Sequence, residues 1–366
     1  MVKKIVLTGG PGSGKTTVLD KIKQVYESQG IKVLIVSETA TELINGGISF
    51  LDDTISLIDF QEMVLRLQLA KEDLVDRVIE LSKKEDILVV YDRGTIDNTA
   101  YINKEEFEEV LTRLNHVKTF SELLNKYDLV INLVGREDFY TTANNAARSE
   151  GVNEALALGE KTLKSWVGHQ RVRIVQPKDT MEEKINEVLN IINDLLDKKQ
   201  VKRQEKYSVD LKDTDLQYVK EHGKEAVIEQ TYLQSEEGVE KRLRKVTFND
   251  SVSYLFSVYK YLANGEKVIV FEKQVDEKIY KSLLEFKDDR YDTIHKTRYY
   301  FTYNGEYFYL DIFANNKDIG VLEINVLKDE VVMIPEFIAV IDNVTRDESY
   351  YNKVIALKER KELKKK

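Results

Sequence analysis

Short apolar runs alternate with amphipathic stretches along the first half of the chain. An apolar run bounded by turn residues is typical of a buried strand, and a 3.6-residue period predicts a helix. The expected strands cover residues 5–7, 31–36, 87–90, 129–134 and 171–175, and the expected helices cover residues 18–29, 60–81 and 181–196. This alternation predicts a doubly wound, parallel α/β domain over residues 1–197.

A different pattern fills the second half, after a charged stretch at residues 198–224 that we expect to be a linker. Alternating, aromatic-rich runs predict strands at residues 226–233, 241–247, 254–261, 267–271, 298–303, 306–313 and 321–326. Asn264-Gly265 and Asn304-Gly305 fall between paired runs, as hairpin turns do. Strands that follow an α/β unit predict a separate antiparallel β domain, a barrel or sandwich, over residues 225–345. Residues 346–366 are expected to form a basic tail.

A glycine-rich motif follows the first expected strand. Residues 9–16 satisfy GxxxxGK[ST], with a strand before them and a helix start after them. Glycines let backbone N–H groups converge on phosphate oxygens, and the helix start adds partial positive charge. We expect Lys15 to reach the outer phosphates of a nucleotide and Thr16 to hold Mg²⁺. The expected nucleotide-binding residues are Gly9, Gly10, Pro11, Gly12, Ser13, Gly14, Lys15, Thr16 and Thr17.

Two carboxylates follow other expected strands, at the edge of a parallel sheet where ligands bind. Glu38 follows the second strand, where it can activate water or a substrate hydroxyl, or can cap the next helix together with Thr39. Asp92 closes the third strand, where a phosphate loop requires a carboxylate that supports Mg²⁺. The helix at 60–81 has Gln61, Arg66 and Glu72 among its polar positions, most of which are expected at its surface.

The polar segment at residues 136–151 carries Arg136 and Arg148. In P-loop kinases such a segment forms a lid whose arginines neutralise charge on the transferred phosphoryl group. A solvated loop with two bystander arginines is the alternative.

Charged residues recur at a period of two within the expected strands of the second half. Arg242 and Arg244 share one side of a strand, as do Lys296 and Arg298. Isolated carboxylates within apolar strands require cations or metal as partners. We therefore expect the basic residues to hold a polyphosphate and the acids to bind Mg²⁺ or Mn²⁺. These acids are Glu229, Glu272, Asp311 and Glu323.

Composition narrows the class of protein. The chain has 366 residues, of which 42% are hydrophobic and 33% charged, as expected for a folded protein of two domains. The 55 Lys and Arg residues against 64 Asp and Glu residues give a net charge of -9, which argues against a dedicated nucleic-acid binder. Cysteine is absent, so a disulfide or cysteine nucleophile is excluded. Without a signal-peptide pattern or a membrane-spanning run, we expect a cytoplasmic protein.

Several motifs of the first half resemble a known family. LTGGPGSGKTT, SETATELINGGISF, YDRGTIDNTAY and YDLVINLVGREDFYTTANNAARSE are similar to the P-loop domain of the TRPL translocation defect proteins. More broadly, they resemble AAA-type ATPase domains akin to small nucleoside kinases. The resemblance implies binding of ATP or GTP and machinery for phosphoryl transfer, without naming an acceptor.

The second half resembles the CYTH, or triphosphate tunnel metalloenzyme, fold. The similar segments are IEQTYL, RLRK, VYK, FEKQV, KTRY, LDIF and LEINV, between residues 228 and 326. The resemblance implies an antiparallel β-barrel that binds a polyphosphate or another phosphorylated anion, with anionic lipid as one candidate. The implied basic residues are Arg242, Arg244, Lys260, Lys296 and Arg298.

The chain departs from the CYTH pattern at its acids. Of the opening ExExK motif the second glutamate, Glu229, is present, and Val227 and Thr231 flank it. Gln274 and Asn325 stand where second carboxylates are usual. Because an amide or alkyl group cannot replace a metal-binding carboxylate, binding is favoured over hydrolysis in this half.

Three functions follow from these observations. The first is an enzyme that uses ATP or GTP with Mg²⁺ for phosphoryl transfer, either to water as an NTPase hydrolase or to a small molecule as a kinase. The second is a nucleotide-dependent switch or binding module in which turnover is incidental. The third is a tunnel triphosphatase whose chemistry lies in the second half.

Overall fold

The computed structural model describes residues 1–51, 54–115, 118–135, 152–196, 204–262, 267–326 and 332–358. The chain divides into two compact units. The first unit comprises Met1–Thr119 and Lys126–Asn193, and the second comprises Phe120–Asn125 and Asp194–Lys366.

The first unit contains a parallel sheet of five strands, in the order β2-β3-β1-β4-β5. The strands are β1 (Val2–Thr8), β2 (Lys32–Val36), β3 (Ile87–Asp92), β4 (Leu129–Leu133) and β5 (Val172–Val175). Both faces of such a sheet are covered, so its central strands are continuous apolar runs, and all five residues of β4 are buried. The expected parallel α/β domain is confirmed.

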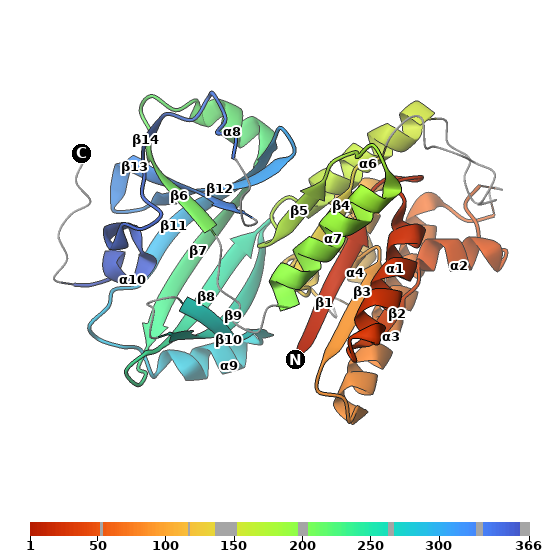
Figure 1. The fold of residues 1–366 in the computed structure, drawn as a ribbon, viewed down its shortest axis with the longest axis horizontal. Helices are drawn as coiled ribbons and strands as arrows, with labels where there is room; N and C mark the ends of the chain where they lie inside the picture. The colour runs from red at the N-terminus through yellow and green to blue at the C-terminus, as the bar shows by residue number, and fades with distance from the viewer. Residues whose placement is uncertain are drawn as a thin grey trace. The chain divides into compact units, whose positions relative to one another are not determined.

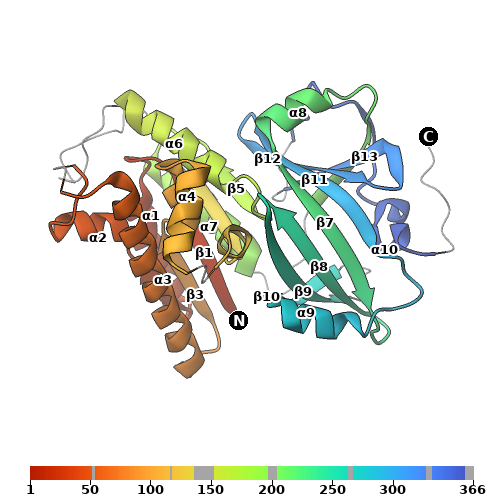
Figure 2. The same cartoon turned by 180° about the vertical axis from the view of Figure 1, so that it is seen from behind.

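Helices cover the two faces of this sheet. They are α1 (Lys15–Ser28), α2 (Thr39–Asn45), α3 (Leu57–Leu81), the 3₁₀ helix η1 (Thr95–Ala100), α4 (Lys104–Arg113), α6 (Val152–Trp166) and α7 (Met181–Leu196). Helices α1 and α7 lie on one face, and α3 and α4 on the other (Figures 1 and 2). The Tyr26 hydroxyl of α1 donates to the Leu189 carbonyl of α7 at 3.1 Å. None of the described helices combines the length and apolarity needed to cross a bilayer.

The second unit contains an antiparallel sheet of nine strands, in the order β10-β9-β8-β7-β11-β12-β13-β6-β14. The strands are β6 (Gln204–Asp210), β7 (Lys224–Leu233), β8 (Val239–Phe248), β9 (Ser251–Tyr261), β10 (Lys267–Val275), β11 (Ile294–Tyr303), β12 (Glu306–Phe313), β13 (Asn316–Asn325) and β14 (Val340–Asn343). The expected antiparallel β domain is confirmed. Among the described residues, β10 and β14 are the two edge strands of the sheet and do not pair with each other, so the expected closed barrel is not confirmed.

Short helices complete the second unit. They are α5 (Phe120–Leu124), α8 (Leu216–His222), α9 (Glu277–Leu284), η3 (Glu348–Tyr350) and α10 (Asn352–Ile355). Helix α5 precedes β4 in the chain but belongs to the second unit, where the Phe120 ring stacks on Phe248 with centroids 5.8 Å apart.

One predicted hairpin turn is confirmed, and the other lies outside the described residues. Asn304 and Gly305 join β11 to β12 with φ values of 47° and 79°. Positive φ at both central residues is the requirement of a type I′ turn, which Asn-Gly meets well. Asn264 and Gly265 fall between residues 262 and 267, outside the described part.

The expected linker at 198–224 and tail at 346–366 are wrong in part. Residues 204–224 contain β6 and α8, and Val209 and Val219 are buried in the core of the second unit. Tyr350 and Ile355 of the expected tail are buried as well, whereas residues 359–366 lie outside the described part. The high charge of both segments hid a few apolar positions that face the sheet.

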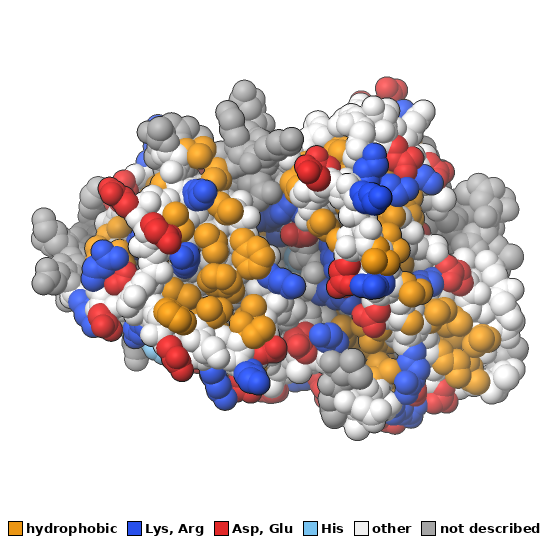
Figure 3. Space-filling view, turned by 90° about the horizontal axis from the view of Figure 1, so that it is seen from below, with side chains coloured by type: hydrophobic (Ala, Val, Ile, Leu, Met, Phe, Trp, Pro, Cys, Tyr) orange, Lys and Arg blue, Asp and Glu red, His pale blue; other side chains and the backbone are white. Residues whose placement is uncertain are grey.

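Basic and acidic side chains lie interspersed on the molecular face drawn in Figure 3. Such mixing avoids a broad field of one sign, so this face does not have the electrostatic footprint of a nucleic-acid binder.

Gly94, which follows β3, packs against the single tryptophan of the chain, Trp166. A Cβ atom at position 94 would lie 2.6 Å from Cζ2 of this fully buried ring. We expect Gly94→Ala to lower the free energy of unfolding of the first unit by about 1–3 kcal/mol through overpacking. Urea denaturation followed by tryptophan fluorescence measures it.

Gly135→Ala is the matched control, because its Cβ atom would meet Leu156 Cδ2 at an ordinary 3.7 Å. An equal loss in both variants, or none in Gly94→Ala, would contradict the close packing of Gly94.

Candidate phosphoryl-transfer site

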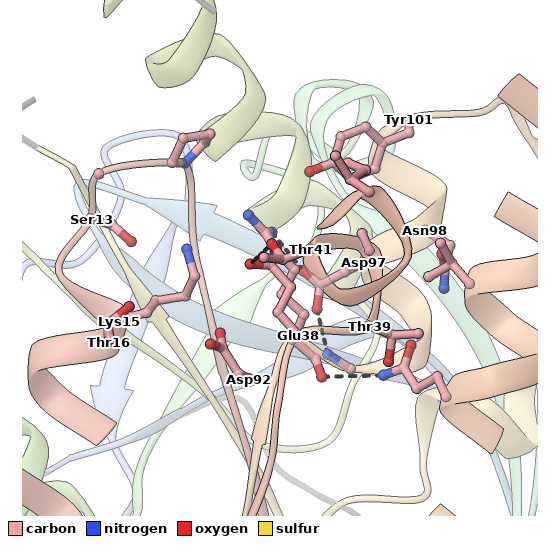
Figure 4. Close-up of a pocket in the computed structure, with 18 of the residues that line it drawn as sticks. Ser13, Lys15, Thr16, Glu38, Thr39, Thr41, Asp92, Asp97, Asn98 and Tyr101 are labelled. Carbon is pink, nitrogen blue, oxygen red and sulfur yellow. Dashed lines mark hydrogen bonds and ion pairs between the residues drawn. The ribbon is translucent and has the colours of Figure 1, made fainter. Parts of the chain in front are cut away.

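A cavity of 570 Å³ lies in the first unit, at the carboxyl ends of the parallel strands. Its lining comes from residues 11–17, the start of α2, the first half of α3, the end of β3 and η1. In Figure 4, Lys15 and Thr16 lie on one side of the pocket, Asn98 and Tyr101 on the other, and Asp92 and Glu38 between them. The volume is in the range of small-molecule sites, roughly 300–1,000 Å³.

The glycine-rich motif forms a tight loop that only glycine accommodates at several positions. Gly9, Gly12 and Gly14 have φ values of 133°, 73° and 90°, and a Cβ atom at Gly9 would lie 2.2 Å from the Leu133 carbonyl oxygen. Helix α1 begins at Lys15, so its first backbone N–H groups face the cavity side of the loop. This is the strand, loop and helix arrangement that the sequence predicted.

Lys15 is buried against its own loop. Its Nζ atom donates to the carbonyl oxygens of Gly9 and Gly10, at 3.0 Å each. Burial lowers the pKa of Lys15 to about 8, and the nearby Arg93 charge adds to the effect. The ammonium group is therefore hydrogen-bonded to neutral carbonyl oxygens, which an anion can replace.

A second lysine, which the sequence did not reveal, supports the loop from α7. Lys184 Nζ donates to the Ser13 carbonyl oxygen at 2.9 Å and to the Val134 carbonyl oxygen at 2.6 Å. These bonds fix the loop to the segment that follows β4. Lys184 occurs 171 residues after Ser13, so the contact has no local signal in the sequence.

Arg93 connects three parts of the site. Its guanidinium pairs with the Glu38 carboxylate, and Nη1 lies 3.8 Å from Asp97 Oδ1. Asp97 also accepts bonds from the Thr8 hydroxyl and, at 2.6 Å, from the Gly94 N–H. Arg93 has a φ of 68°, a backbone conformation that side chains other than glycine rarely adopt and that recurs at functional sites.

These contacts set the charge state of Glu38. Burial alone would raise the pKa of Glu38, but the Arg93 and Lys15 charges, with hydrogen bonds from Arg93 and Thr41, lower it to about 2. Glu38 is also the residue before the first turn of α2, but its side chain does not cap that helix. Of the two expected roles, the structure therefore favours the one in the pocket.

Asp92 is the acid best placed to receive a metal ion. Burial, and next the Glu38 charge, raise the pKa of Asp92 to about 6. Its Oδ1 atom is buried and has no hydrogen-bond partner among the described residues. A cation beside such an oxygen would restore the ionised carboxylate, and the Thr16 hydroxyl lines the same cavity. The donor set therefore fits Mg²⁺.

Amide and aromatic side chains also line the cavity. Gln61 and Gln68 of α3 are 4% and 5% exposed, and Asn98 comes from η1. Phe50, Phe60 and Tyr101 also line the cavity. The expected surface position of Gln61 is therefore wrong, because this face of α3 points to the cavity.

Glu72 was also expected at the helix surface and is fully buried instead. Its Oε1 atom accepts the Tyr127 hydroxyl at 2.7 Å, and Lys126 pairs with the other oxygen. The expected lid arginines, Arg136 and Arg148, lie outside the described residues.

In the second unit, one side of the sheet carries charged side chains, which we call the charged face. Its residues are Lys206, Glu240, Arg242, Arg244, Lys267, Glu272, Lys296, Arg298, Asp311 and Glu323. Strand register places neighbours opposite each other: Arg298 faces Asp311, and Lys206 faces Glu323. The predicted pairs Arg242 with Arg244 and Lys296 with Arg298 thus meet on one face.

The acids of the charged face are held by cations. Asp311 accepts two bonds from Arg298, at 2.6 and 2.7 Å, and one from Lys296. Glu323 accepts from Arg298 at 2.9 Å and pairs with Lys206 at 2.8 Å. Lysine and arginine take the oxygens that metal binding would need. No cluster of three metal-ligating side chains occurs among the described residues, so the expected metal site does not fit.

Two predicted residues of the second unit lie on the wrong face. Glu229 faces His295 and Lys245 across its neighbouring strands and pairs with Lys245 at 2.8 Å. Lys260 is exposed, and its neighbour Tyr259 is the residue that faces Arg242. A spacing of two shows which residues of one strand share a face. Which face of the sheet they share with residues of other strands, here Arg242 and Arg244, depends on how the strands pair.

Comparison with known proteins relates the first unit to a family of domains. Residues 4–184 match the model of a family described as an AAA domain. The match supports a P-loop domain in the first unit. The match covers slightly less than half of the chain and includes the whole glycine-rich loop, Glu38, Asp92 and Lys184.

Solved structures are similar at a lower level. Two structures of the protein NE1496, titled as a hypothetical protein and as an inorganic triphosphatase, are 24% and 23% identical. They cover 42% and 43% of this chain and 96% and 95% of their own, each with a TM-score of 0.31. The protein PH1819 from Pyrococcus horikoshii OT3 is 17% identical, covering 34% of this chain and 80% of its own, with a TM-score of 0.28. At these values the likeness assigns no activity to this chain. No curated protein matches it.

The first unit should show a pH dependence of stability to which the carboxyl group of Asp92 contributes. Its pKa of about 6 in the folded protein lies above the ordinary 3.8, so the folded protein binds the proton more tightly than the unfolded chain. Without Mg²⁺, the free energy of unfolding should therefore fall as pH rises from 3.8 to about 6, and Mg²⁺ should oppose the fall. Chemical denaturation across this pH range measures both.

Asp92→Asn isolates the effect, because an amide does not titrate. The low pKa of Glu38 acts with the opposite sign and at lower pH. An unchanged pH slope in Asp92→Asn would show that another group is responsible.

Proposed function

We propose that the first unit binds ATP or GTP with Mg²⁺ and transfers the γ-phosphoryl group to a small hydroxylated molecule. One observation carries this proposal: a single cavity has the phosphate loop at one side, a wall with the amide of Asn98 and the ring of Tyr101 at the other, and the carboxylates of Asp92 and Glu38 between them. Water needs no such wall. A kinase therefore fits the cavity better than an NTPase, which remains the second outcome of the test below.

The charges of the cavity support a metal-bound nucleotide rather than a bare one. Among the described lining residues, the carboxylates of Glu38, Asp92 and Asp97 outnumber the cations of Lys15 and Arg93. A nucleotide without metal would add negative charge to this excess of acid. Thr16 and Asp92 would hold Mg²⁺, which neutralises phosphate charge when bound.

Lys15 and Arg93 supply the fixed positive charge. Lys15 would exchange the carbonyls of Gly9 and Gly10 for phosphate oxygens, a stronger charge-assisted bond. Arg93 is held by Glu38 and Asp97, so its position costs no reorganisation when charge develops on the transferred group. This is the role that the sequence assigned to Arg136 or Arg148.

Glu38 would orient the acceptor rather than take up its proton early. Its pKa of about 2 makes it a weak base but keeps it ionised as a hydrogen-bond acceptor. Phosphoryl transfer passes through a loose transition state, in which positioning matters more than proton removal. A hydroxyl bonded to Glu38 would lie between the loop and the amide wall.

We also infer that the second unit binds a small, multiply charged oxyanion. The observation that favours this is the excess of basic over acidic side chains in the charged face, together with buried guanidinium nitrogen atoms of Arg242 and Arg244 that lack a partner among the described residues. Hydrolysis by this unit is disfavoured, because cations hold Asp311 and Glu323.

Lys15→Ala should reduce turnover of γ-labelled ATP or GTP by about 10²–10³-fold, because it removes a fixed donor to the transferred group. Lys21→Ala is the control, since Lys21 is an exposed residue of the same helix. Reactions run with and without small metabolites distinguish the outcomes: a new labelled compound supports the kinase, and labelled phosphate alone supports the NTPase.

Tight nucleotide binding without turnover would instead support a switch. Turnover that survives Lys15→Ala would contradict the proposal for the first unit and place the chemistry in the second.

A further inference from the structure

Glu272 lies at the edge of the charged face, on β10. Its Oε2 atom accepts from Arg244 Nη2 at 2.9 Å, from Ser257 Oγ at 2.8 Å and from the Tyr259 hydroxyl at 3.3 Å. One carboxylate oxygen thus meets three donors from β8 and β9. Such convergence of donors is what a bound oxyanion requires.

Further donors lie on the same face and remain unsatisfied. Nε of Arg242, Nε of Arg244 and Nε2 of Gln274 are buried and have no hydrogen-bond partner within the described part of the chain. Arg242 as a whole is 8% exposed. Buried donors without acceptors are rare and unfavourable, so their number here indicates that the face has more donor capacity than Glu272 uses.

Strand register brings these groups together. Arg242, Ser257 and Glu272 lie opposite one another across β8, β9 and β10, and Arg244, Leu255 and Gln274 form the next row on the same face. The donors therefore come from three adjacent strands and do not depend on a loop. Burial lowers the pKa of Arg244, and the Arg242 charge adds to this effect, as expected for two cations that share one site.

Glu272 differs from Asp311 and Glu323 in its exposure and in its position in the sheet. Asp311 and Glu323 lie on inner strands, and their side chains are 1% and 4% exposed. The Glu272 side chain is 28% exposed, and among the described strands β10 pairs only with β9 and has an irregular register between Ile269 and Phe271. An edge strand with a bulge can move its side chain away from the site more easily than an inner strand can.

A metal ion does not account for this arrangement. The one oxygen of Glu272 described above already accepts from an arginine and two hydroxyls, all of which are donors to anions. Arg244 and Gln274, its neighbours on the face, add further N–H groups, of which Arg244 Nε and Gln274 Nε2 lack a partner among the described residues. A hard cation prefers carboxylate and carbonyl oxygens, whereas this set would repel it.

We propose that Glu272 is an internal counter-ion that occupies a metal-independent site for a phosphate-type oxyanion, and that an external polyphosphate displaces it. The proposal rests on the anion-binding function inferred above for the second unit, and it adds the role of Glu272 and the independence of the site from metal. The displaced carboxylate turns to solvent. The oxyanion takes over its three donors and gains those of Arg242, Arg244 and Gln274.

The test measures binding of tripolyphosphate to the full chain by calorimetry, in EDTA and in Mg²⁺. Every variant carries Lys15→Ala, so that the loop of the first unit is weakened as a second site. Glu272→Ala should bind tripolyphosphate about fivefold more tightly or better, because the competing carboxylate is gone, and EDTA should not abolish binding. Arg244→Ala should lose about tenfold or more, as expected for a hydrogen bond between charged groups.

Glu229→Ala is the matched control. Glu229 is a partly exposed acid of the same sheet, paired with Lys245 on the opposite face, so its loss changes net charge equally without touching the site. It should leave the affinity unchanged. Should Glu272→Ala fail to fold, as judged by circular dichroism, Glu272→Gln removes the charge with the same shape.

The results separate the inference from the function on which it rests. Weaker binding in Glu272→Ala together with loss of binding in EDTA would make Glu272 a metal ligand and overturn the inference alone. An equal gain in tripolyphosphate affinity in Glu229→Ala would show that net charge alone causes the effect, and it would also overturn the inference. Absence of binding in every variant would overturn the anion-binding function of the second unit itself.

Discussion

The ion pair between Arg93 and Glu38 is the interaction on which the site of the first unit depends. A guanidinium buried in a protein must be paired, and Arg93 meets this requirement through Glu38 after β2 and Asp97 in η1. Asp97 in turn accepts from Thr8 at the end of β1. The ends of three parallel strands are thus fixed by one network of charges. Asp92, which lines the same cavity, keeps a buried oxygen without a hydrogen-bond partner among the described residues.

The second unit also contains buried cations that need partners, but the groups left without a partner are different. The buried cations Lys296 and Arg298 are paired with acids of β12 and β13, so that Arg298 bridges Asp311 and Glu323 as Arg93 bridges Glu38 and Asp97. Here, however, cations hold Asp311 and Glu323, and the buried side-chain atoms without a partner among the described residues of this unit are donors. An excess acceptor beside a phosphate loop fits a metal ion, and excess donors beside arginines fit an anion.

The sequence predicted what depends on local patterns. The loop at residues 9–17, the parallel strands and the type I′ turn at Asn304-Gly305 each follow from residues close together in the chain. It did not predict Lys184 or Arg93 as parts of the site, because their contacts join distant segments or need a rare backbone conformation. Glu229 and Lys260 were misplaced for a related reason: a period of two leaves the choice of face to strand pairing. β6 and α8 were hidden because charged neighbours outnumber their apolar positions.

Both proposed ligands would replace a partner that the protein supplies itself, and the nature of that partner sets how they bind. Lys15 rests on the neutral carbonyls of Gly9 and Gly10, which give up a cation readily to phosphate. Arg244 is paired with the charged carboxylate of Glu272. An incoming anion must therefore interact with Arg244 more favourably than this carboxylate does in order to bind. On these proposals the first unit favours tight binding of a nucleotide, whereas the second responds to anions of high charge and at higher concentration. The same internal partners lower the free-energy cost of burying these cations while no ligand is bound. For this reason the basic residues alone do not identify either site.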